Sequence, residues 1–313
     1  MKSACGLAVA LAVSSLVGCG SVEGGKLDAA GGDAPKTADA PGDDAPSAPC
    51  DVTKPFGTPA RVPGLADMDS QGWLSPDQLT IYFVRTNSTS HDDVWSGTRA
   101  NTTAAFSNLA MLGGVNTNDF ERRAVVTSDG LAMFVAVYEI NGSVFQIKVS
   151  TRNSTTAQFS TASPVANIYS AGQGDGTPWI SEDGLTILFS SLRNNADYDI
   201  FRSTRASTGA TFGTPAAIAE LNGTGADDYP VLSNDGREIF FGTNRGLNYL
   251  QIWHATRSTP SDGFGTPTAV TELNVADNTY PNWLSPDRCT LYFTSKRPNG
   301  STGQDLWVAS RPQ

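Results

Sequence analysis

The sequence contains few of the residues on which most enzyme chemistry depends. Histidine occurs twice among 313 residues, as His91 and His254, and neither has the spacing of a zinc ligand. There is no G-x-S-x-G nucleophile elbow and no G-x-x-x-x-G-K-S/T phosphate loop. The sequence therefore predicts no metal and no cofactor, and it favours a protein that is not an enzyme.

Basic residues are also scarce. Lysine and arginine together number 21 against 31 aspartates and glutamates, which gives a formal net charge of −10. Recognition of nucleic acid needs a basic surface, and anionic lipid attracts polybasic segments. The charge balance therefore excludes nucleic acid as a partner and argues against electrostatic binding to a membrane surface.

No apolar run is long enough to span a bilayer. Residues 7–17 are largely apolar and follow Lys2, but a membrane span needs about 20 such residues. Residues 1–18 are therefore expected to be a secretory signal peptide. The residues Leu16-Val17-Gly18-Cys19 resemble the bacterial lipobox, which implies cleavage before Cys19 and lipidation of that cysteine; an ordinary signal peptide is the alternative.

The lipobox resemblance also implies a location. Gly20 stands where an aspartate would retain such a lipoprotein in the inner membrane, so an outer-membrane lipoprotein facing the periplasm or the cell surface is expected. Residues 19–50 are rich in Gly, Ala, Asp and Pro and cannot bury enough apolar surface to fold. They are expected to be a disordered tether between the lipid and a folded domain at residues 51–313.

A unit of just over 50 residues recurs five times in that domain. Its turn aspartates are spaced 52, 54, 52 and 52 residues apart, at Asp77, Asp129, Asp183, Asp235 and Asp287. Each copy holds four short alternating segments rich in Val, Ile, Phe and Thr, separated by Gly, Asn, Asp, Ser and Pro. This pattern predicts an all-β fold, a five-bladed β-propeller of four-stranded blades. The aspartates themselves fit type I turns, so a turn-forming role is favoured over a catalytic one.

The order of the parts predicts how the ring closes. A Phe-Gly-Thr-Pro segment normally follows the third strand of a copy, yet the first example precedes every blade. Residues 57–62 are therefore expected to pair with residues 305–310 of the last blade. Cys50 and Cys289 remain once Cys5 leaves with the signal and Cys19 is lipidated, and a disulfide between them would join this seam. Two separate thiols are the alternative.

The repeat resembles a known family. Ile180-Ser181-Glu182-Asp183-Gly184, Ile187-Leu188-Phe189-Ser190-Ser191 and Asp199-Ile200-Phe201 are similar to the WD40-like repeats of the TolB propeller, and the likeness covers all five copies. It implies a periplasmic protein that binds protein partners, as TolB binds a peptidoglycan-associated lipoprotein. TolB has six blades and an N-terminal α/β domain, so the identity of the partner is not implied.

Two sets of loops are expected to share one face of the propeller, and they carry charge in a repeating pattern. The candidate ligand-binding residues on this face are Asp67, Asp69, Glu121, Arg123, Glu139, Asp175, Arg193, Asp227, Arg245, Asp277 and Arg297. They form either a polar mouth for a ligand or pairs that hold the loops. Copy two departs most from the pattern, with Glu121-Arg122-Arg123, so a site is expected near blades one and two; drift of the repeat is the alternative.

These features favour a monomeric, lipid-anchored, non-enzymatic module that binds a protein or a cell-wall component. The alternative is a five-bladed glycoside hydrolase or a sugar-binding lectin. A hydrolase needs two carboxylates about 5–9 Å apart in the central funnel. Its candidates are Asp67, Asp69, Glu121 and Glu139.

Overall fold

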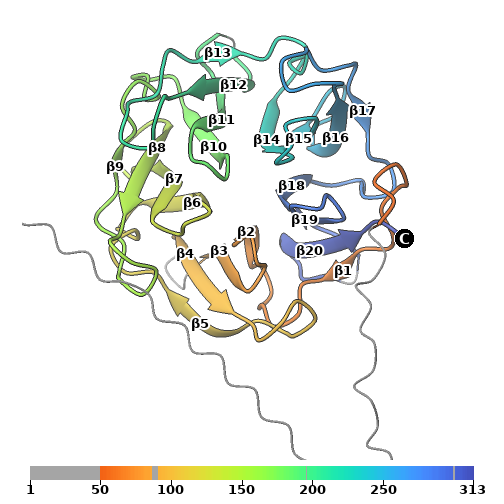
Figure 1. Cartoon of the computed structure of the whole chain (residues 1–313), viewed down its shortest axis with the longest axis horizontal. Helices are drawn as coiled ribbons and strands as arrows, with labels where there is room; N and C mark the ends of the chain where they lie inside the picture. Colours follow the sequence, from red (N-terminus) through yellow and green to blue (C-terminus); the bar gives the residue numbers. More distant parts are fainter. Residues whose placement is uncertain (1–49, 87–90, 195, 299) are drawn as a thin grey trace, which may run out of the picture. The chain divides into compact units, whose positions relative to one another are not determined.

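The computed structural model describes residues 50–86, 91–194, 196–298 and 300–313. The predicted signal peptide, the predicted lipidation site Cys19 and nearly all of the predicted tether lie outside the described residues. What is described is all-β, with five four-stranded antiparallel sheets arranged as a five-bladed propeller, as predicted (Figure 1). No helix in this part of the chain is long and apolar enough to cross a membrane.

Each blade is a sheet of four sequential strands, except that the last blade takes its outer strand from the start of the domain. Blade one contains β2 (Ser70–Leu74), β3 (Thr80–Thr86), β4 (Asp92–Thr98) and β5 (Ser107–Met111). Blade two contains β6 (Phe120–Val126), β7 (Ala132–Tyr138), β8 (Phe145–Thr151) and β9 (Ser163–Pro164). Blade three contains β10 (Asp175–Ile180), β11 (Thr186–Ser191), β12 (Asp199–Thr204) and β13 (Ala216–Ala217). Blade four contains β14 (Asp227–Leu232), β15 (Glu238–Thr243), β16 (Gln251–Thr256) and β17 (Thr268–Ala269). Blade five contains β18 (Thr279–Leu284), β19 (Thr290–Ser295), β20 (Asp305–Ser310) and β1 (Ala60–Arg61).

The first strand of each blade lies innermost and the fourth lies at the rim (Figure 1). The inner strands β2, β6, β10, β14 and β18 contact their neighbours around the ring. The second strands supply the packing between sheets, because their aromatic residues are buried; Phe83, Phe189, Phe241 and Phe293 are fully buried. The propeller core is therefore a stack of blades that leaves the strand ends and loops to form two opposite faces.

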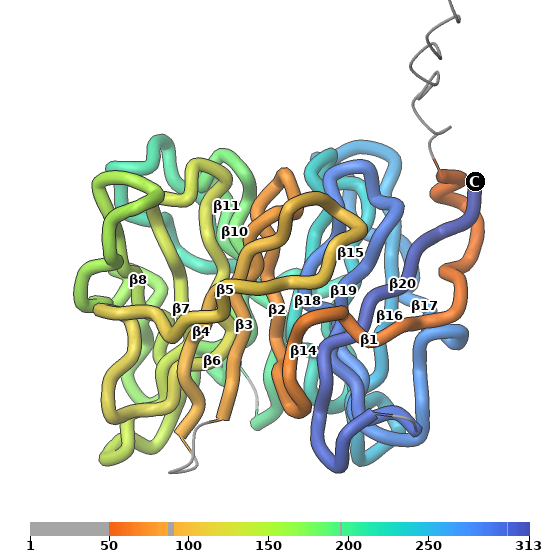
Figure 2. Tube along the Cα trace, turned by 90° about the horizontal axis from the view of Figure 1, so that it is seen from below, coloured from red at the N-terminus to blue at the C-terminus, as the bar shows by residue number. Residues whose placement is uncertain are grey.

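The ring closes as predicted. Ala60 and Arg61 of β1 pair with Val308 and Trp307 of β20, and the Gly57 N–H donates to the Ser310 carbonyl at 2.8 Å. Figure 2 shows this orange segment running beside the blue β20 and the C-terminus. β1 covers the outer edge of β20, so the last blade ends in a two-residue edge strand like those of blades two, three and four.

The repeated aspartates form turns, as predicted. In every blade the Ser or Thr hydroxyl that begins the turn donates to the aspartate at 2.5 to 2.6 Å. The same carboxylate accepts the backbone N–H two residues later at 2.9 to 3.1 Å. These carboxylates are occupied by local backbone, which is the Asx-turn chemistry expected of aspartate at such positions.

A second repeated interaction links each third strand to the neighbouring segments of the blade. The arginine that follows the strand lies over the ring of a linking phenylalanine, 4.3 to 4.6 Å from its centroid. It also donates to a backbone carbonyl of the inner turn. The five pairs are Arg99–Phe106, Arg152–Phe159, Arg205–Phe212, Arg257–Phe264 and Arg311–Phe56. The last pair joins the two ends of the domain.

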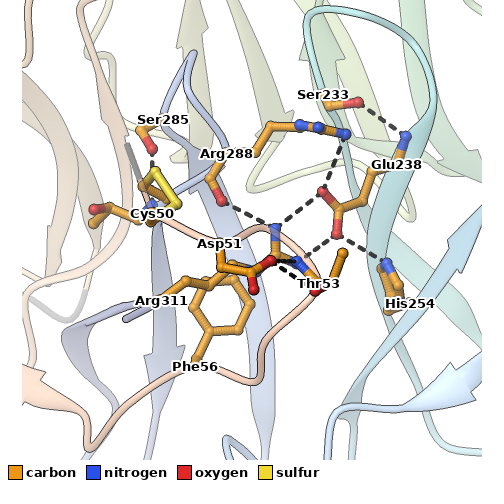
Figure 3. A network of polar contacts seen from close by, with 12 residues as sticks. Cys50, Asp51, Thr53, Phe56, Ser233, Glu238, His254, Ser285, Arg288 and Arg311 are labelled. Carbon is orange, nitrogen blue, oxygen red and sulfur yellow. Dashed lines mark hydrogen bonds and ion pairs between the residues drawn. A yellow bond between two sulfur atoms is a disulfide. The ribbon is translucent and has the colours of Figure 1, made fainter. Parts of the chain in front are cut away.

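The closing seam carries further links. The structure joins Cys50 and Cys289 by a disulfide, with their Cα atoms 5.7 Å apart. Nearby, Glu238 accepts from Arg311 Nη2 at 2.5 Å and pairs with His254 Nε2 at 2.9 Å (Figure 3). Burial raises the pKa of Glu238, but the hydrogen bonds from His254 and Arg311 outweigh it and leave the pKa at about 2. This carboxylate is therefore ionised and fully engaged in holding blades four and five together.

Candidate binding site

The inner strands share a backbone irregularity at one repeat position. The residue two places after the acidic residue at the start of the inner strand has a positive φ in four blades, at Gln71 (55°), Arg123 (47°), Thr177 (42°) and Tyr229 (53°). The pairing with the second strand shifts register at this point in each case. Non-glycine residues rarely adopt such backbone angles, and residues that do so cluster at functional sites.

These four residues meet at the face where the inner strands begin, which we call the mouth face. They border two adjoining cavities, the mouth pockets, of about 360 and 70 Å³. Gln71, Arg122 and Tyr229 border both. The larger pocket is otherwise bordered by Met68, Ser70, Val84, Thr86, Asp92, Leu250, Asn278, Tyr280 and Gln304. The smaller is otherwise bordered by Arg123, Ala136, Phe145, Gly176, Thr177, Ser190, Tyr198 and Asp228. All five blades therefore contribute to the mouth pockets.

Two tyrosines form an aromatic wall. The rings of Tyr229 and Tyr280 stack with centroids 3.9 Å apart and planes 21° apart. The Tyr280 hydroxyl donates to Gln304 Oε1 at 2.7 Å. Burial raises the pKa of Tyr280 to about 12 and that of Tyr229 well above its usual value. Both hydroxyls are therefore neutral at physiological pH, and Tyr229, the less buried of the two, offers an apolar surface backed by Tyr280.

Two adjacent arginines of β6 differ sharply in their surroundings. Arg122 is 44% exposed at its side chain and its Nε donates to Asp92 Oδ2 at 2.5 Å. Arg123 is fully buried, and its Nη2 donates to the Asn282 carbonyl at 2.8 Å. Its Nε and Nη1 have no hydrogen-bond partner among the described residues. Burial lowers the pKa of Arg123 to about 10, so the guanidinium is still charged at neutral pH.

One carboxylate borders the smaller pocket. Asp228 accepts from the Thr177 hydroxyl at 2.5 Å and from the Tyr229 N–H at 2.8 Å. Burial raises its pKa in spite of these hydrogen bonds and of the Arg123 charge. Gln71 adds a second acceptor, because its buried Oε1 has no partner in the part of the chain that the structure describes.

Most of the predicted site residues lie elsewhere and are engaged in ion pairs within their own blades. Asp175 and Arg193 approach to 2.6 Å, and Asp227 and Arg245 to 2.9 Å. Blade one uses Arg85 for this purpose, 2.6 Å from Asp69, an arginine that sequence reasoning did not assign. These three carboxylates are fully buried, so these pairs hold loops, which was one of the two predicted roles.

The remaining predicted residues also lie outside the mouth pockets. Asp67 is an exposed partner of Arg61 at 2.8 Å, Glu139 pairs with Lys148 at 2.8 Å, and Asp277 lies 3.7 Å from Lys296. Arg297 donates to the Leu273 carbonyl at 2.8 Å, as Arg193 and Arg245 donate to the equivalent carbonyls. It forms no ion pair among the described residues, because blade five has Thr279 where other blades have a carboxylate.

Glu121 is the exception to the pairing pattern. It is fully buried and accepts from the Thr117 hydroxyl at 2.5 Å, while its Oε2 has no partner among the described residues. Burial raises its pKa to about 7. It does not border the mouth pockets, so of the eleven predicted site residues Arg123 alone does so.

Sequence reasoning missed several residues of the mouth pockets, notably Gln71, Thr177 and Tyr280. A signal for them was present. The repeat is nearly constant in its turns and outer strands, whereas the inner-strand position with a positive φ carries Gln71, Arg123, Thr177 and Tyr229 in different blades. Variation at one position of a regular repeat marks side chains that the fold itself does not specify.

The chain was compared with known proteins. No family model matches it, and no curated protein matches it. The structure of a putative TolB from Agrobacterium tumefaciens is 17% identical, with a TM-score of 0.45, over 74% of this chain and 70% of that one.

Glycoside hydrolases are similar at the level of the fold. A thermostable family-43 glycoside hydrolase is 13% identical, with a TM-score of 0.54, over 81% of this chain and 92% of that one. The catalytic domain of a GH62 α-L-arabinofuranosidase from Coprinopsis cinerea is 10% identical, with a TM-score of 0.51, over 82% of this chain and 96% of that one. At such low identity these similarities establish the propeller fold and no activity.

Proposed function

We propose that this chain is a non-catalytic binding module of the bacterial cell envelope that takes its ligand in the mouth pockets. The observation that carries the proposal is their construction: all five blades contribute, and the pockets are bordered by polar groups, including Arg123 and Gln71, that have buried atoms without partners among the described residues. Buried polar groups in folded proteins are otherwise almost always satisfied. Unmet donors and acceptors beside a cavity favour a ligand that completes them.

The setting of this activity rests on the sequence. The signal peptide at residues 1–18, the lipobox-like residues ending at Cys19 and the polar tether favour export and attachment to the outer membrane through lipid. A tethered domain of this kind meets envelope proteins and the cell wall, and these are the partners we propose. The disulfide between Cys50 and Cys289 is consistent with an oxidising compartment.

A sugar ligand is the second candidate, because the stacked Tyr229 and Tyr280 offer a flat apolar wall beside hydrogen-bonding groups. Hydrolysis of the sugar is less favoured. Among the described residues the carboxylates that border the mouth pockets are Asp92 and Asp228, and Asp92 is ion-paired with Arg122. The four carboxylates that the sequence offered for hydrolysis all lie outside these pockets.

The proposal is tested with the full chain in detergent, as wild type, Tyr229→Asn and Arg202→Gln. Asparagine tolerates the positive φ of Tyr229 while removing its ring. Arg202 is an exposed residue of β12 outside the mouth pockets, so its variant is the matched surface control. We expect sedimentation with purified peptidoglycan, or cross-linking to an envelope protein, to fall at least about tenfold in Tyr229→Asn alone.

Two outcomes contradict the proposal. Binding that is equal in all three proteins would place the ligand away from the mouth pockets. Turnover of a panel of aryl glycosides that Tyr229→Asn abolishes would show that the mouth pockets are catalytic.

A further inference from the structure

We infer that the mouth pockets recognise a carboxylate whose neighbouring atoms carry an N–H or O–H donor. This inference rests on the function proposed above and specifies the chemistry of its ligand. It follows from the charges around the smaller pocket, from the acceptors beside them and from the size of that pocket.

One of the two arginines at the smaller pocket has no counter-ion within ion-pair distance in the part of the chain described, because Asp228 favours the charge of Arg123 only from beyond 4.0 Å. Arg122 is paired with Asp92 at 2.5 Å, and Asp228 accepts from Thr177 and from the Tyr229 N–H. Arg123 has a backbone carbonyl as its hydrogen-bond partner and no carboxylate within 4.0 Å among the described residues. A buried charge without a close counter-ion is destabilising, and a ligand anion offsets that cost.

The fold does not require an arginine at this place. The equivalent residues in three other blades are Gln71, Thr177 and Tyr229, and all of them fit the same bulged strand with a positive φ. The charge of Arg123 is therefore a property of this one position and not of the blade. A second, independent sign is that its Nε and Nη1 have no partner in the described part of the chain while the side chain borders the smaller pocket.

The acceptors beside Arg123 define the rest of the ligand. Asp228 and the unpartnered Oε1 of Gln71 both border the smaller pocket, and both accept hydrogen bonds. They favour a ligand that presents a donor next to its anionic group. A phosphate dianion would bring two charges to one guanidinium and would meet stronger repulsion from Asp228 than a singly charged carboxylate, so the carboxylate fits better.

The size of the pocket agrees with a small head group. About 70 Å³ accommodates a carboxylate and its neighbouring atoms, while the adjoining 360 Å³ takes the rest of the molecule along Tyr229 and Tyr280. Contact with Arg123 requires a side-chain adjustment of the kind that often accompanies binding. We infer that Tyr229 makes this adjustment, because it borders both pockets and its ring centroid lies 6.0 Å from the Arg123 guanidinium carbon.

Two sources supply this chemistry. A peptide C-terminus carries a carboxylate next to an amide N–H, and a sugar acid carries a carboxylate next to a hydroxyl. The probes are therefore N-acetylalanine for the first source and galacturonate for the second. N-acetylalanine methylamide lacks the carboxylate, and inorganic phosphate supplies a different oxyanion.

The experiment measures the affinity of the full chain for each of the four probes by isothermal titration calorimetry at fixed ionic strength. We expect one of the two carboxylates to bind the wild type, and the methylamide and phosphate to bind at least about tenfold more weakly. Arg123→Gln should weaken the carboxylate at least about tenfold, Arg123→Lys less, and Arg202→Gln not at all. Near-UV circular dichroism of each variant checks that the propeller is folded.

Three results would overturn the inference: no carboxylate binding, phosphate binding as tight as the carboxylate, or equal carboxylate binding by Arg123→Gln. If Tyr229→Asn still abolishes binding to peptidoglycan or to an envelope protein, the carboxylate inference fails and the proposed function stands. If neither the probes nor the envelope components bind in a manner that depends on Tyr229, both the carboxylate inference and the proposed function fail.

Discussion

Blades two and three use one repeat position in opposite ways. Asp175 begins β10 and is held by Arg193 at 2.6 Å, with that guanidinium lying over two aromatic rings. Glu121 holds the equivalent place in β6, but Glu139 stands where blade three has Arg193. Glu121 therefore keeps only a hydroxyl as its partner among the described residues, while Arg123 of the same strand borders the smaller mouth pocket.

The comparison separates two kinds of buried charge. In blades one, three and four the carboxylate and the guanidinium form an ion pair, so the pair belongs to the architecture of the repeat. In blade two both groups are buried and incompletely satisfied. Buried groups of this kind lower stability, and we propose that a ligand in the mouth pockets compensates Arg123, whereas Glu121 lies outside these pockets.

The largest expected effect comes from breaking the matched pair of blade three. Arg193→Met leaves the Asp175 carboxylate buried without its counter-ion, since that side chain is 1% exposed. Loss of one partner of a buried pair costs about 3–5 kcal/mol of unfolding free energy. Urea unfolding measures the loss, and Arg202→Met, an exposed change in the same blade, should alter stability by less than about 0.5 kcal/mol. A loss below about 1 kcal/mol for Arg193→Met would show that the ion pair of blade three contributes little to stability, which would contradict the comparison.

Glu238, which is also ion-paired, should make the stability of the protein depend on pH in the acid range. Its folded pKa of about 2 lies below the ordinary value of 4.5, so the stability it contributes is complete above pH 4.5. That stability is lost as the pH falls from 4.5 toward 2, because the unfolded chain binds the proton first. Glu238→Gln should cost roughly 2–3 kcal/mol at pH 7, and the difference from wild type should vanish near pH 2. A difference that does not depend on pH would contradict this account.

Glu121 should behave in the opposite sense. Its folded pKa of about 7 lies above the ordinary value of 4.5, so the native state binds the proton more tightly than the unfolded chain does. Stability therefore falls as the pH rises from 4.5 to 7. Glu121→Gln keeps an acceptor for Thr117 and removes the charge, and we expect it to be roughly 1–3 kcal/mol more stable than wild type at pH 8. If the variant and the wild type are equally stable at pH 4 and the variant is more stable at pH 8, the Glu121 charge is destabilising, as the comparison of blades two and three requires. A variant that is less stable than wild type at pH 8 would contradict it.

The architecture was predictable because it depends on local rules that repeat. Aspartates such as Asp183 recur at a nearly constant spacing, and the order of the strands predicted that residues 57–62 close the ring. The site was predictable only in part. Arg123 stood out because copy two departs from its neighbours, but Gln71 and Tyr280 did not, since a backbone bulge decides which inner-strand side chains border the mouth pockets.

The central claim is that Arg123 is kept for binding and not for stability, and urea unfolding of Arg123→Met alongside the wild type tests it most directly. The substitution removes a buried, largely unpartnered charge and one hydrogen bond to the Asn282 carbonyl. We predict a stability within about 1 kcal/mol of wild type, or higher, because apolar replacement of poorly compensated buried charge is often neutral or stabilising. A loss of about 3 kcal/mol or more, like that expected for Arg193→Met, would show that Arg123 belongs to the architecture and would contradict the account.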